Sequence, residues 1–136
     1  MYVEVSGLIA RFGEQELIQL TDRASTGVIV TSVAERAIAD ATAEIDGYLR
    51  AGGYTVPLSP APELLERIAA DIARFHLYDD QATEEVRKRY EDQVALLRRI
   101  ASGDVRLGVG EGDGAGSAEV AASERVFTRD GLRDFG

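Results

Sequence analysis

A corner rich in glycine and proline, residues 45–62, is the feature that most constrains how this chain can fold. It connects the end of one helical pattern to the start of another. Apolar side chains stand on both sides of its glycines: Tyr48, Leu49, Tyr54, Val56 and Leu58. A solvated linker would not expose that much apolar surface, because removing such surface from water is what stabilises a fold. We therefore expect a packed corner that holds the two helices together.

The helix before the corner is the most regular pattern in the chain. Apolar residues recur three and four positions apart from Val33 to Leu49, which predicts a helix with one buried face. Ser32 followed by Glu35 matches a capping box, so we expect the helix to start after Ser32. The pair Gly52-Gly53 is a stop signal. Several alanines on the apolar face indicate close approach of a partner helix.

Two more long helices follow the corner. Pro62 suits the first turn of a helix, and the apolar pattern then continues to about Tyr78. Thr83 is a good N-cap for the next helix, and Gly103 ends it. Three apolar faces on three helices require one shared core.

The segment before these helices is shorter and more broken. Residues 3–23 read as two short helical pieces that Gly13 separates, and residues 21–27 are polar and small, which predicts a loop. The β-branched run Val28-Ile29-Val30 is either a short extended stretch or an apolar lead-in that packs on the next helix. We favour the lead-in, because no second strand is obvious nearby.

The sequence therefore predicts an all-α protein: a small bundle of three long helices with short helices at the N-terminus, over residues 1–107. Residues 104–108 are either a short strand or the start of an arm. Residues 108–116 carry five glycines in nine positions, which predicts a flexible glycine-rich linker over residues 108–124. Residues 125–136 regain apolar anchors, which favours a C-terminal docking peptide; the anchors are Val126, Phe127, Leu132 and Phe135.

The composition of the chain limits which kinds of molecule it is expected to bind. The net charge of −9 gives no general attraction to DNA or anionic lipid, although an acidic wall would let DNA slide past as cargo. The chain has no cysteine, which removes thiol chemistry and suits a cytoplasmic protein. No apolar run approaches the roughly 20 residues that span a bilayer, and the first residues do not resemble a signal peptide. We expect no membrane partner.

No residue pattern predicts catalysis, so we expect no catalytic, cofactor-binding or metal-binding residues and no enzyme activity. His76 is the one histidine of the chain, and its apolar neighbours favour a place at the edge of the core. Asp46 and Arg74 lie on the two helices that the corner joins, so they either form an ion pair or a helix-cap contact near the corner, or face solvent.

Two other patterns have weak functional alternatives. The glycine-rich run 108–114 lacks the lysine and the strand-to-helix context of a phosphate loop, which favours a linker over a ligand site. The basic run 87–89, with Arg98 and Arg99, lies among acids on one predicted helix. That arrangement favours a solvated face over a nucleic-acid groove.

Several short motifs occur in the order seen in a family of small phage and prophage structural proteins, typified by one from bacteriophage Mu. They span residues 2–107, with a weaker match at the C-terminus. The motifs are Leu8-Ile-Ala-Arg-Phe-Gly13, Glu16-Leu17, Leu20-Thr-Asp22, Ala41, Glu44-Ile-Asp-Gly-Tyr-Leu49, Tyr54-x-x-Pro57-Leu58, Leu64-Leu65, Asp71-Ile-Ala-Arg-Phe75, Leu77-Tyr78, Ala101-x-Gly103 and Arg125-Val-Phe-Thr-Arg129. The chain resembles that family, and departs from it where Gly53 replaces a basic residue before Tyr54.

The resemblance implies a role in virion assembly, as a head-completion protein or head-to-tail connector. Such a protein would form a ring of identical subunits between portal and tail, with terminal arms that reach neighbours. It would be found in the virion, and in the host cytoplasm before assembly. The alternative is a non-catalytic protein-binding or regulatory module that acts through its C-terminal arm.

Overall fold

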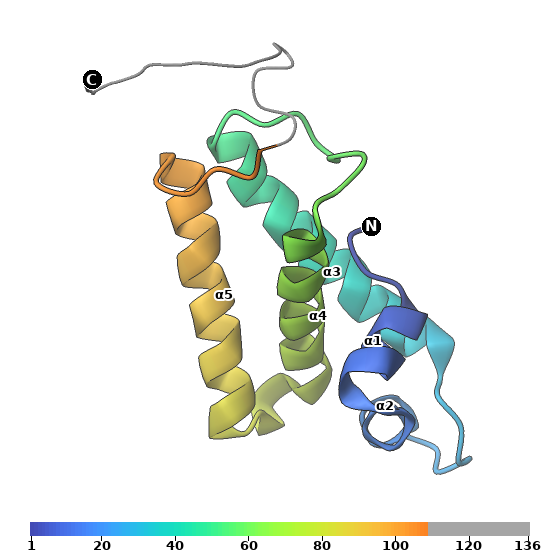
Figure 1. Ribbon diagram of the computed structural model, residues 1–136. Coiled ribbons are helices and arrows are strands. Elements are labelled where there is room, and N and C mark those ends of the chain that lie inside the picture. The colour runs from blue at the N-terminus through green and yellow to red at the C-terminus, as the bar shows by residue number, and fades with distance from the viewer. Residues whose placement is uncertain (109–136) are drawn as a thin grey trace, which may run out of the picture.

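The computed structural model describes residues 1–108, which form an all-α fold without a strand (Figure 1). The prediction of three long helices preceded by short ones is confirmed. The elements are α1 (Val5–Phe12), α2 (Glu14–Thr21), α3 (Thr31–Ala51), α4 (Glu63–Tyr78), a 3-10 turn η1 (Asp79–Gln81) and α5 (Glu84–Ser102). Apart from Gly108, the predicted linker and docking peptide lie outside the described residues.

Helices α3, α4 and α5 pack against one another and form the core, while α1 and α2 lie against α3 and α4 near the start of α3 (Figure 1). Each fully buried leucine or isoleucine there contributes roughly 1.5–3 kcal/mol. The largest fully buried side chains come from every α-helix: Leu8, Leu17, Ile38, Ile45, Leu49, Leu65, Ile68, Ile72, Val86, Leu97 and Ile100.

Most predicted helix ends are confirmed. Gly13 separates α1 from α2 at a φ of 93°, and Gly103 ends α5 in the left-handed conformation. The Thr83 side chain accepts a hydrogen bond from the Val86 amide, as an N-cap should. Pro62 stands at the N-cap position of α4, one residue before the first turn.

The predicted capping box at Ser32 is wrong. Helix α3 begins at Thr31, its N-cap is Val30, and no side chain caps it. The reason is a tertiary contact: the buried hydroxyl of Thr21, at the end of α2, accepts a hydrogen bond of 2.9 Å from the Val30 amide. That contact fixes the backbone immediately before the helix, so the start of α3 does not depend on serine.

Residues 22–30 form an irregular loop, which hydrogen bonds to the Asp22 side chain stabilise. Asp22 Oδ1 accepts hydrogen bonds from the Thr26 amide at 2.9 Å and the Thr26 hydroxyl at 2.8 Å, and Oδ2 accepts one from the Gly27 amide. Of the predicted apolar lead-in, Ile29 packs against the core, whereas Val28 is 58% exposed. The lead-in prediction therefore holds for Ile29 only.

The corner is packed, as predicted. Tyr54 and Leu58 are buried in the same core as the helices. The end of α5 approaches so closely that a Cβ added at Gly52 would lie 3.1 Å from the Ala101 Cα. Beyond α5 the chain returns to the corner, where the Leu107 amide donates to the Tyr54 hydroxyl at 3.2 Å.

Candidate functional site

Tyr2 fastens the N-terminal segment to the bundle. Its hydroxyl donates to Asp46 Oδ1 of α3 at 2.5 Å and accepts from the Leu58 amide of the corner at 3.1 Å. Burial and the Asp46 hydrogen bond raise the pKa of Tyr2 to about 12. One buried hydroxyl thus connects the start of the chain to α3 and to the corner.

Arg74 fastens α2 to α4. Its Nε lies 2.6 Å from Glu16 Oε2 and its Nη2 lies 3.2 Å from Glu16 Oε1, a two-pronged contact that lysine cannot make. The guanidinium also lies over the Phe12 ring, 4.4 Å from the ring centre. Tyr78 adds a hydrogen bond of 3.2 Å to the same carboxylate.

The predicted ion pair, helix-cap contact and solvated position for Asp46 and Arg74 are therefore wrong. The two side chains do not pair, and neither is simply solvated. Asp46 is bound by Tyr2, and Arg74 by Glu16. Sequence reasoning considered only the two helices that the corner joins, whereas the actual partners come from the N-terminal segment.

A third polar contact joins the three long helices. Glu44 of α3 accepts from the Tyr90 hydroxyl of α5 at 2.8 Å, and its other oxygen lies 3.3 Å from His76 Nε2 of α4. The rings of Phe75 and Tyr90 stack at 4.1 Å, and burial followed by the Glu44 hydrogen bond raises the pKa of Tyr90 to about 12. His76 is half-buried here, which matches the predicted place at the core edge.

A fourth polar contact joins α4 to α5. Buried Asp71 likewise accepts from Gln93 at 2.7 Å, a pair between α4 and α5. Sequence reasoning missed Tyr2, Glu16 and Glu44, because a polar residue beside an apolar stripe gives no signal of its distant partner. Tyr90 did carry a signal in the sequence, because it falls at helical spacing among the apolar residues of α5.

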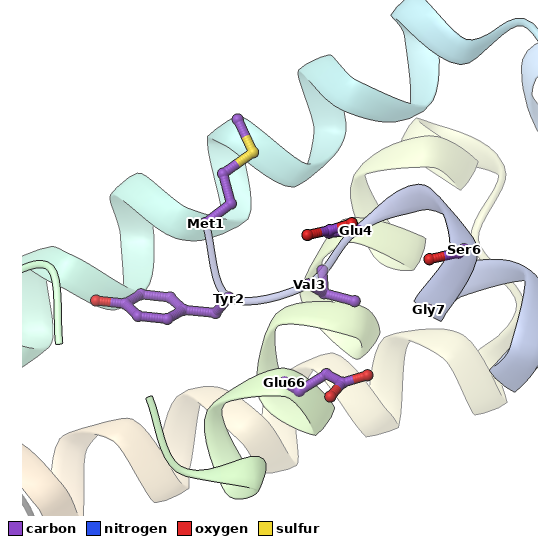
Figure 2. A pocket seen from close by; sticks show the side chains of 7 residues that line it. All are labelled: Met1, Tyr2, Val3, Glu4, Ser6, Gly7 and Glu66. Atoms are coloured by element: carbon purple, nitrogen blue, oxygen red, sulfur yellow. The ribbon is translucent and has the colours of Figure 1, made fainter. Parts of the chain in front are cut away.

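A shallow hollow of about 250 Å³ lies beside the N-terminal segment (Figure 2). Glu66 of α4 and Gly7 of α1 approach closely there, since a Cβ at Gly7 would lie 3.2 Å from Glu66 Oε2. Glu66 also forms a long ion pair of 3.7 Å with Arg11. The residues that line the hollow are Met1, Tyr2, Val3, Glu4, Ser6, Gly7 and Glu66.

The remaining candidate residues lie on the surface. Arg87, Lys88 and Arg89 are exposed, and the last two pair with acids one turn away on α5, as a solvated face would. Within residues 1–108, no cluster of three or more His, Cys, Asp or Glu side chains is placed to hold a metal ion. The helices described are all too short or too polar to cross a membrane. The absence of catalytic and cofactor residues stays a prediction.

Comparison with known proteins identifies relatives of this chain. The family model described as bacteriophage Mu gp36 matches residues 2–125. The chain is 35% identical over 134 residues to gene product J of Escherichia phage Mu. That alignment covers 94% of this chain and 94% of gene product J. The chain is 34% identical over 113 residues to the Mu-like prophage FluMu protein gp36 of Haemophilus influenzae, which covers 83% of this chain and 79% of that protein. The chain therefore belongs to the bacteriophage Mu gp36 family of phage and prophage proteins.

Proposed function

We propose that this phage protein is a head-completion or head-to-tail connector that forms a ring between portal and tail. Its membership of the Mu gp36 family carries the proposal. Several described polar side chains support it, because each of them joins one element of the fold to another. Tyr2, Arg74 and Glu44 each bind a partner on another element.

In this role the subunit acts through its shape and its contacts. Each copy sits against the portal on one side and against tail or other connector proteins on the other. Identical contacts between neighbouring copies close the ring. The chain carries a net charge of −9, so double-stranded DNA passes as cargo and is not held. The protein is in the host cytoplasm before assembly and in the virion afterwards.

Deletion of the gene in the parent phage or prophage tests this function. The expected result is a lysate with heads and tails that lie apart in electron micrographs, and joined particles when the gene is supplied in trans. Joined, infectious particles without the gene would contradict the connector function. They would favour the alternative, a non-catalytic binding module that acts through its C-terminal arm.

Truncation after Gly108 tests the role of residues 109–136. If these residues tie adjacent subunits, the shortened chain keeps the helical circular dichroism and unfolding midpoint of the full chain but fails to restore joined particles. A truncated chain that restores them would dismiss a role for the arm in assembly.

A further inference from the structure

We propose that copies of this chain associate head to tail, with Val28 of one copy in the hollow beside Glu4 and Glu66 of the next. The inference rests on the proposed function, because a ring needs one contact that repeats between unlike surfaces. Three features support this contact: the exposed Val28 side chain, the size of the hollow and the charges on both surfaces.

The loop between α2 and α3 presents Val28 to solvent. Val28 is 58% exposed, and among residues 1–108 Met1 is the one other large apolar side chain exposed to this degree. The loop is nevertheless ordered by Asp22, which accepts hydrogen bonds from Thr26 and Gly27. A loop that is already ordered loses little conformational freedom when it binds, so its apolar side chain is well suited to a contact.

The hollow is open to solvent and has room for a branched side chain, since its volume is about 250 Å³. Its lining is mixed: apolar side chains stand beside polar and charged ones. Met1 and Val3 provide apolar lining, Glu66 of α4 lies close to Val3, and Ser6 lies at the start of α1 (Figure 2).

The charges of the two surfaces are complementary. Arg23 is exposed in the same loop as Val28, and it forms no ion pair within residues 1–108. The hollow carries two carboxylates: that of Glu66 already forms a long ion pair of 3.7 Å with Arg11, whereas that of Glu4 is exposed and does not cap α1. Opposite charges beside an apolar contact favour the correct register and speed the encounter of two copies.

The two surfaces are different parts of the molecule. Val28 lies in the loop that precedes α3, whereas the hollow is built from the N-terminal segment, α1 and α4. A contact between them leaves one free loop and one free hollow on every pair of copies. Association therefore continues to a closed ring or an open filament, and does not stop at a symmetric dimer.

Disulfide cross-linking of the full chain tests the contact directly. The chain has no cysteine, so Val28→Cys with Ser6→Cys places the two reactive thiols of each chain at the proposed contact. Under mild oxidation we expect a ladder of covalent multimers, in concentrated protein and in particles. The matched control is Val28→Cys with Ala39→Cys on an exposed position of α3, which should give no ladder.

Charge exchange in the Val28→Cys, Ser6→Cys background tests the register. Arg23→Glu alone and Glu4→Arg alone should each reduce multimer yield several-fold, and the two together should restore it. Absence of multimers above dimer size in both samples would overturn the proposed contact. If deletion of the gene separates heads from tails but cross-linking gives no ladder, the connector function is supported and this contact is wrong. A ladder of multimers, combined with joined infectious particles when the gene is deleted, would support this contact and contradict the connector function.

Discussion

Arg74 of α4 and Glu16 of α2 face each other, with the Arg74 Nε atom 2.6 Å from Glu16 Oε2 and both side chains largely withdrawn from solvent. The pair lies between the long helices and the short N-terminal ones. Because the guanidinium also covers the Phe12 ring, a single arginine contacts both α1 and α2. This contact adds to the buried side chains and the Tyr2 hydroxyl in attaching residues 1–21 to the bundle.

Replacement of Arg74 by alanine should therefore loosen the N-terminal helices. It leaves the Glu16 carboxylate half-buried without its cation, which we expect to cost about 2–3 kcal/mol in the free energy of unfolding. Arg74→Lys keeps the charge but loses the two-pronged contact, so its loss should be intermediate. Urea unfolding measures both changes. Hydrogen exchange should locate the loosening in α1 and α2, and equal exchange in mutant and wild type would contradict the assignment.

Gly52→Ala should destabilise the protein at the contact between α3 and α5. The new Cβ would lie 3.1 Å from the Ala101 Cα and from the Ile100 carbonyl oxygen, and backbone atoms cannot move aside as a side chain can. We expect a loss of about 1–3 kcal/mol from overpacking. Thermal and urea unfolding measure it.

Gly47→Ala is the matched control. Gly47 lies within α3, and a Cβ there meets nothing within 4 Å. Alanine should stabilise the helix by about 0.5–1 kcal/mol, because glycine loses more conformational freedom on folding. Equal effects of the two substitutions would show that close packing at Gly52 is not the cause.

Stability should fall at high pH because of two tyrosines, the buried Tyr2 and the half-buried Tyr90. Tyr2 and Tyr90 have pKa values raised to about 12 in the folded chain, against an ordinary value of 10.0. The protonated phenols favour the fold, so their contribution is complete below pH 10 and disappears as the pH rises through 12. Urea midpoints measured from pH 9 to pH 12 should decline.

The variants Tyr2→Phe and Tyr90→Phe should each flatten that decline. Each also loses the hydrogen bonds of its hydroxyl, at a cost of about 1–2 kcal/mol near neutral pH. Tyr48→Phe is the control, since no hydrogen bond of its hydroxyl is found in the described part of the chain. A decline that stays as steep in both variants would dismiss these tyrosines as its source.

Thr83→Ala and Ser32→Ala should differ, although both residues looked like N-caps. Thr83 accepts from the Val86 amide, so its loss should cost about 1 kcal/mol. Ser32 lies inside α3 and caps nothing, so its replacement should be close to neutral. Chemical unfolding of the two variants decides this, and a large cost at Ser32 would contradict the observed start of α3.

Helix positions could be predicted from the sequence because local signals fix them. The glycines at positions 13, 52 and 103 and the cap at Thr83 act within one or two turns, and each predicted end was confirmed within a residue or two. The start of α3 escaped prediction because Thr21, nine positions away, fixes Val30 through a tertiary hydrogen bond. Local rules do not include such a contact.

The polar contacts could not be predicted for the same physical reason. Tyr2 and Asp46 are 44 positions apart, and Arg74 and Glu16 are 58 apart. Helical spacing shows which face a residue occupies but not which helix covers that face. The same limit applies to the hollow, which exists because α1, α4 and the N-terminal segment meet.

The position of the protein in purified particles tests the central proposal most directly. Gold-conjugated antibodies against the chain, viewed by electron microscopy on joined particles and on particles gently separated into heads and tails, would report that position. The connector function predicts label at the junction of head and tail, and nowhere else on the particle. Label spread over the head, label at the far end of the tail, or particles without the protein would contradict it.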